Sequence, residues 1–130
     1  MAYPVTLNPL PLGKITVTTP GTPVRLTSAL SQSPKAPAGN ADIMEDLLAD
    51  KLQLKTLATT SGSLGQNAGL IYIGRQDMNK ATLAGVYMIL EPGESQWFSS
   101  TGGGNILRIG DYWVDADNAN DWVTGWAHVA

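Results

Sequence analysis

The sequence contains no cysteine among its 130 residues and only one histidine. Without cysteine, neither a disulfide framework nor a thiolate metal site can form. His128 lies in a strand-like run, where a lone imidazole is more often a packing or surface residue than a catalytic base. The sequence also has no Gly-x4-Gly-Lys or G-x-G-x-x-G segment to hold phosphates. These absences predict a non-enzymatic protein with no catalytic, cofactor-binding or metal-binding residues.

Charge is scarce, because only 15% of the residues are charged and the net charge is −3. Nucleic-acid binding needs clustered Lys and Arg to displace counterions from phosphates. The eight basic residues instead occur singly, at Lys14, Arg25, Lys35, Lys51, Lys55, Arg75, Lys80 and Arg108. We therefore expect no nucleic-acid partner.

Long hydrophobic runs are also missing, since no apolar run approaches the roughly 20 residues that a membrane helix needs. The first residues, MAYPVTLNPLPLG, have neither the basic start nor the continuous apolar stretch of a signal peptide. We expect no membrane partner, and a soluble protein made in a cytoplasm.

Short apolar segments separated by turn residues are abundant, with 14 Gly and 8 Pro in the chain. The central unit is Leu70–Phe98, which contains LIYIG, AGVYMIL and SQWF. Asn79–Leu90 could also be read as a helix, but Val86, Tyr87 and Ile89 favour a strand there. Further short strands are expected at residues 14–19, 24–27, 51–60, 106–109, 112–114 and 122–129.

The turn inside this unit is Glu91-Pro92-Gly93-Glu94, with Pro and Gly at the second and third positions of a type II turn. Type II turns splay the flanking strands instead of matching their twist. This turn therefore predicts a corner at which the chain passes between two sheets.

Together these patterns predict an all-β protein, a small antiparallel sandwich or barrel (jelly-roll-like) with at most one short helix. Residues 14–130 would form a single β domain with a long loop at 28–50. Within that loop, DIMEDLLAD at 42–50 has helical spacing and a D-x-x-E capping pattern. A short helix and an irregular loop both fit this segment, whose four carboxylates suit a solvated acidic face better than a cation site.

Residues 1–13 form a proline-rich extended segment that is too apolar for water. Pro4, Pro9 and Pro11 exclude a helix and a central strand. The segment either lies over its own domain or is an arm that docks on a neighbouring subunit or partner.

An acidic segment, Asp115–Asp121 (DADNAND), begins with the D-x-D spacing of a calcium loop. An EF-hand loop would also need an oxygen ligand, Gly and Glu where this chain has Ala119, Asn120 and Trp126. Asp and Asn also favour turns. The segment is predicted to be the turn that joins the last two strands.

Aromatic residues crowd the last third of the chain, and two pairs are adjacent in sequence: Trp97-Phe98 and Tyr112-Trp113. Because side chains alternate along a strand, each pair puts one ring on each face of a sheet. We expect at least one ring of these pairs to lie outside the core, where it marks a protein interface or a surface that stacks on sugars.

The order NAGLIYIGRQDM, GVYMILEPGESQWF and NILRIGDYWVDADNANDWV resembles small all-β structural proteins of tailed-bacteriophage virions. KITVTTPGTPVRLT is similar to the first hairpin of such proteins, and the likeness covers residues 13–27 and 67–129. It implies a non-enzymatic decoration (cement) protein on the capsid surface of the virion, made in the host bacterial cytoplasm. The implied partner is the major capsid protein of a phage head, and the implied assembly is a dimer or trimer.

Two alternatives remain open: a carbohydrate-binding or fibre-associated module on the virion, and a head-completion or tail component. For the decoration function, the arm and the aromatic residues supply the candidate interface. Its residues are Tyr3, Leu7, Leu10, Leu12, Trp97, Phe98 and Trp113.

Overall fold

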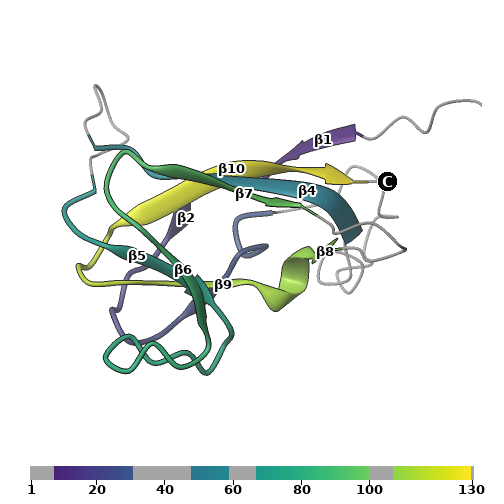
Figure 1. Cartoon of the computed structure of the whole chain (residues 1–130). Coiled ribbons are helices and arrows are strands. Elements are labelled where there is room, and N and C mark those ends of the chain that lie inside the picture. Colours follow the sequence, from purple (N-terminus) through teal and green to yellow (C-terminus); the bar gives the residue numbers. More distant parts are fainter. Residues whose placement is uncertain (1–7, 31–47, 59–66, 100–106, 130) are drawn as a thin grey trace, which may run out of the picture.

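The structure is a computed structural model that describes residues 8–30, 48–58, 67–99 and 107–129. Two antiparallel sheets pack against each other in a sandwich-like arrangement (Figure 1), which confirms the all-β prediction. In the described residues the one helical element is a 3-10 turn, Ile109–Asp111. No helix there is long and apolar enough to cross a membrane.

The larger sheet has the strand order β1-β10-β4-β7, with β2 also paired to β10 and β8 also paired to β4. Its strands are β1 (Asn8–Pro11), β2 (Ile15–Thr16), β4 (Leu48–Lys55), β7 (Ser95–Ser99), β8 (Leu107–Arg108) and β10 (Trp122–Val129). The smaller sheet has the order β3-β9-β5-β6. Its strands are β3 (Val24–Arg25), β5 (Ile71–Gly74), β6 (Val86–Leu90) and β9 (Trp113–Ala116).

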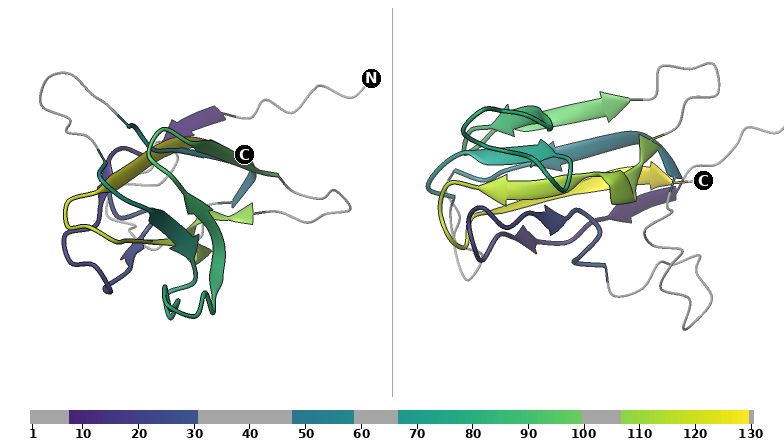
Figure 2. Two further views of the ribbon diagram at one scale, coloured as in Figure 1. Left: turned by 60° about the vertical axis from the view of Figure 1, so that its left-hand side comes forward. Right: turned by 90° about the horizontal axis from the view of Figure 1, so that it is seen from below.

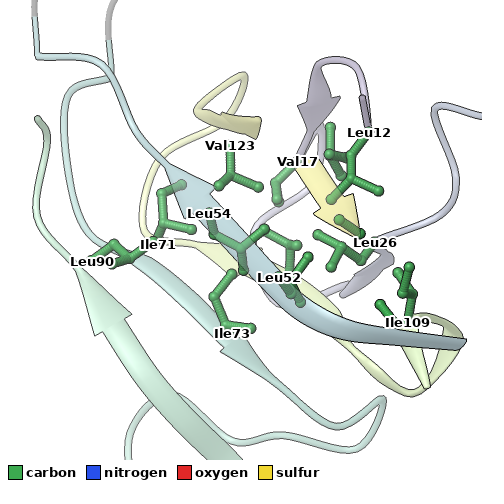
Figure 3. Close-up of a cluster of buried hydrophobic side chains, with 14 of the residues drawn as sticks. Leu12, Val17, Leu26, Leu52, Leu54, Ile71, Ile73, Leu90, Ile109 and Val123 are labelled. Carbon is green, nitrogen blue, oxygen red and sulfur yellow. The ribbon is translucent and has the colours of Figure 1, made fainter. Parts of the chain in front are cut away.

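The core lies between the two sheets and is built by the alternation of side chains along each strand (Figure 3). In β4, Leu52 and Leu54 are fully buried, whereas Lys51 and Lys55 are exposed. Ile71 and Ile73 of β5 face them from the other sheet. Each such side chain contributes about 1.5–3 kcal/mol when it is fully buried. The other labelled core residues are Leu12, Val17, Leu26, Leu90, Ile109 and Val123.

The segment between β5 and β6 folds over the outer face of the smaller sheet. Lys80 Nζ donates a hydrogen bond of 2.6 Å to the carbonyl oxygen of Ala116 in β9. It also lies 6.0 Å from the centre of the Tyr72 ring, which is almost completely buried. Lys80 therefore ties this segment to β9 and lies near the ring of Tyr72 in β5.

The corner predicted at Glu91–Glu94 is confirmed, because β6 belongs to the smaller sheet and β7 to the larger. Gly93 has a φ of +92°, and the amide of Glu94 donates to the carbonyl of Glu91 over 3.0 Å. Thr56, just after β4, holds the corner from the side. Its hydroxyl donates to the Glu91 carbonyl over 2.7 Å and accepts from the Gly93 amide over 3.1 Å.

The second half of the proline-rich segment is an edge strand of the domain itself. β1 pairs antiparallel with β10 from Asn8–Val129 to Pro11–Trp126. A strand with two prolines is tolerated at a sheet edge, where some N–H groups would face solvent. Leu10 and Leu12 are buried in the core, so this part of the segment lies over its own domain.

Several strand boundaries differ from the predictions. Residues 48–50, placed in the helix or loop of 42–50, belong instead to β4, because Ala49 pairs with Leu107 of β8 and Val129 of β10. Residues 42–47 lie outside the described residues. The strand expected within Asn79–Leu90 is confined to β6, since turns occupy 79–85. The strands expected at 14–19, 24–27 and 106–109 are each only two residues long.

Candidate interaction surface

The outer face of the larger sheet is formed by alternate residues of its central and edge strands. In β4, the outward residues are those between and beside the buried leucines: Lys51, Gln53 and Lys55. The register places Gln53 between Trp126 of β10 and Trp97 of β7. We call the row Trp126–Gln53–Trp97 the tryptophan row.

The tryptophan row is held together by direct contacts. The rings of Trp97 and Trp126 meet edge to face, with centroids 5.2 Å apart and planes at 89°. The indole Nε1 of Trp126 donates a 2.6 Å hydrogen bond to Oε1 of Gln53. This bond fixes the orientation of both side chains, while Trp97 at the end of the row remains 48% exposed.

A third ring, the imidazole of His128, extends the row along β10. The imidazole of His128 lies 4.4 Å from the Trp126 ring, centroid to centroid. Its Nδ1 is 4.0 Å from Oδ1 of Asp50. His128 therefore contacts an aromatic ring and a carboxylate, as expected for a packing or surface residue.

The side chains on this surface are of kinds that can contact another molecule. A half-exposed indole offers apolar area and a ring face, the Gln53 amide offers hydrogen bonds, and Lys51 and Lys55 offer positive charge. Protein interfaces and sugar-binding surfaces both use this combination.

Most other predicted interface residues lie elsewhere in the fold. Trp97 and Phe98 point to opposite faces, as predicted, and Phe98 packs against the core. Trp113 lies in the smaller sheet, with the Arg25 guanidinium 4.7 Å above its ring. Leu10 and Leu12 are core residues, which corrects their assignment as docking residues. Tyr3 and Leu7 lie outside the described residues.

Two members of the tryptophan row were not among the predicted interface residues. Trp126 was one of several aromatic residues in the last third of the chain, and nothing distinguished it from the buried Trp122. Gln53 alternates with Leu52 and Leu54, so its outward direction was predictable from the strand pattern. Its place between two tryptophans depends on pairing with β7 and β10, which the local sequence does not reveal.

Residues 117–121 of the acidic segment form the predicted turn between β9 and β10, whereas Asp115 and Ala116 belong to β9 itself. Its buried carboxylates hold backbone amides in place. Asp121 accepts from the amides of Ala68 and Gly69 over 3.0 and 2.9 Å. Asp115 accepts from the amide of Gly21 over 2.9 Å. These contacts tie distant loops to the turn. In the described part of the chain, no group of three or more His, Cys, Asp or Glu residues is placed to hold a metal ion.

No protein-family model, curated protein or solved structure matches this chain. The likeness to phage virion proteins therefore remains an expectation from the sequence.

Proposed function

We propose that the chain is a non-enzymatic structural protein of a tailed-phage virion that decorates and stabilises the capsid. The tryptophan row is the observation that best supports this proposal, because it is a preorganised aromatic surface on the exposed side of a rigid sheet. Half-exposed tryptophans are typical anchors of protein interfaces. The partner would be the major capsid protein.

Binding of many copies to one particle would strengthen the attachment of each copy. Specific interfaces bury roughly 1,200–2,000 Å² in total, and many copies on one particle add their effects through avidity. An oligomer would place several tryptophan rows on neighbouring capsomers at once.

Cosedimentation with empty heads built from the major capsid protein of the same virion tests the proposal. We expect the protein to bind the heads saturably. Heads that carry the protein should come apart at a higher temperature than bare heads. Trp97→Ala should weaken binding at least about tenfold, since loss of a central interface residue often costs 2 kcal/mol or more. Tyr87→Ala is the matched control, because Tyr87 is similarly exposed, at 50%, but lies in the smaller sheet. Heads that do not bind the wild-type protein would contradict the proposal.

A second candidate function is carbohydrate binding by the same surface. The specific observation in its favour is the Gln53 amide beside a half-exposed indole, because sugars need both a stacking surface and hydrogen-bonding groups. Quenching of tryptophan fluorescence by host polysaccharide, abolished in Trp97→Ala, would favour this function. Head binding without quenching would favour decoration.

A further inference from the structure

One side of the sandwich exposes two edge strands together. β7 is the edge of the larger sheet and β6 the edge of the smaller, and the four-residue corner joins them. The right-hand view of Figure 2 shows the green β6 and β7 at one side and the purple strands β1–β3 at the opposite side. Among the described strands, each of these two edges has only one neighbour.

The two sides of the sandwich differ in how their edges are protected. On the far side, β1 carries two prolines, β2 and β3 are two residues long, and β3 contains Arg25. Prolines, short strands and charges are the common devices that stop edge strands from pairing with other chains. β6 (VYMIL) and β7 (SQWFS) contain neither a proline nor a charged residue.

The register of β7 with β4 identifies the backbone groups of β7 that do not bond to β4. The amide of Thr56 donates to the carbonyl of Glu94, and the same register places Leu54 opposite Gln96 and Leu52 opposite Phe98. Hydrogen-bonded pairs alternate along an antiparallel ladder, so Gln96 and Phe98 bond to β4. The N–H and C=O groups of the alternate residues, Ser95, Trp97 and Ser99, therefore point away from β4.

Exposed apolar side chains lie on these two strands or within a few residues of them. Among the described residues, five large hydrophobic side chains are exposed, and four of them fall within the short stretch from residue 83 to residue 97. They are Leu83, Tyr87, Ile89 and Trp97. The two unprotected edge strands and most of the exposed apolar side chains therefore belong to the same part of the chain.

We propose that this side is a homodimer interface, in which β7 pairs antiparallel with β7 of a second copy about a twofold axis at Trp97. Trp97 then faces Trp97 of the second copy, and Ser95 faces its Ser99. The residues that pair are the three whose backbone groups point outward, so every one of these groups gains a partner.

A second copy is favoured as the occupant because β7 is complementary to itself. The paired segment is uncharged, so the twofold brings no like charges into direct opposition. On the outer face, the serines separate Lys51 and Lys55 from the lysines of the second copy. The two larger sheets become one continuous sheet, and the two tryptophan rows meet at Trp97.

Sedimentation equilibrium over about a hundredfold concentration range tests this pairing. We expect a reversible monomer–dimer equilibrium. Ser99→Pro removes an outward N–H that the monomer does not use, and should raise the dissociation constant at least about tenfold. Ser99→Ala is the matched control, because it retains the N–H and should dimerise like the wild type. Circular dichroism checks that both variants fold.

Amide hydrogen exchange supplies a residue-specific readout. The Gln96 and Phe98 amides should be protected at every concentration, and those of Trp97 and Ser99 should gain protection only as the dimer forms. A monomer at all concentrations would overturn the proposal, as would a dimer that leaves these two amides unprotected or that Ser99→Pro does not weaken. Protection that appears only when another protein is added would assign this edge to that partner instead.

Discussion

At the scale of single residues, Tyr72 places a phenol in an environment that resists its ionisation. Burial raises the pKa of Tyr72 above its ordinary value of 10.0, and the hydrogen bond from its hydroxyl to Asp117 raises it further. The charges of Asp117 and Asp115 act in the same direction. Burial also raises the pKa of Tyr112, with smaller effects from Tyr87 and Asp111.

These shifts predict a loss of stability in alkali. Well below pH 10.0 the phenol is neutral in both the folded and the unfolded chain, so its contribution to stability is constant. Above pH 10.0 the unfolded chain loses the proton first, and the free energy of unfolding falls as the pH rises through the raised pKa.

In Tyr72→Phe the free energy of unfolding should therefore fall less steeply as the pH rises above 10.0. The fall that remains is due to Tyr112. At neutral pH the same substitution should cost about 0.5–1.5 kcal/mol, because it removes the hydrogen bond to Asp117. Urea unfolding at pH values on both sides of 10.0 measures both effects, with Tyr112→Phe measured in parallel to give the share of the second phenol. Equal slopes for wild type and Tyr72→Phe would refute the role of this phenol.

At the scale of elements, the corner at residues 91–94 decides how the two sheets are connected. Gly93 has a φ of +92°, a region that side chains with a Cβ rarely adopt, and an added Cβ would lie 3.3 Å from Cβ of Ala58. Gly93→Ala should destabilise the domain by about 1–3 kcal/mol through backbone strain and this contact.

Gly21→Ala is the matched control for this prediction. Gly21 has nearly the same φ, +91°, but an added Cβ would meet nothing within 4 Å. The difference between the two variants in urea unfolding therefore isolates the contact with Ala58. If Gly93→Ala proved no more harmful than Gly21→Ala, that contact would have no energetic importance.

Elements whose signals are local were predictable from the sequence. The corner follows from Pro92-Gly93 chemistry, and β10 follows from the aromatic and β-branched residues within 122–129. The start of β4 was not predictable, because Ala49 is held in a strand by Leu107 and Val129, which lie far away in the sequence. The same reason applies to the tryptophan row. Alternation predicts the opposite directions of Trp97 and Phe98, but only the sheet order brings Trp97 next to Trp126.

At the scale of the whole molecule, the first described strand is part of the folded domain and not an appendage. Deleting residues 2–12 would remove β1 together with the buried Leu10 and Leu12. We expect this deletion to lower the free energy of unfolding by at least about 3–6 kcal/mol from the loss of those two side chains alone.

Deleting only residues 2–7 leaves β1 and both leucines in place, and so separates arm binding from folding. Thermal unfolding of the two truncated proteins should show a much lower melting temperature for the longer deletion than for the shorter one. Similar stability of the two would mean that β1 contributes nothing to the domain. Of the two, only the shorter deletion is suited to test the arm in binding to heads.

The pairing of β1 with β10 also determines how the domain responds to a pulling force. Asn8 lies opposite Val129, so the first and last described strands present their outer ends at the same place. A force that draws these two ends apart acts across the β1–β10 ladder and opens its hydrogen-bonded pairs one after another, beginning at Asn8–Val129. We therefore expect the β1–β10 ladder to open at a low force when the domain is stretched between Asn8 and Val129, whatever its resistance to heat or urea.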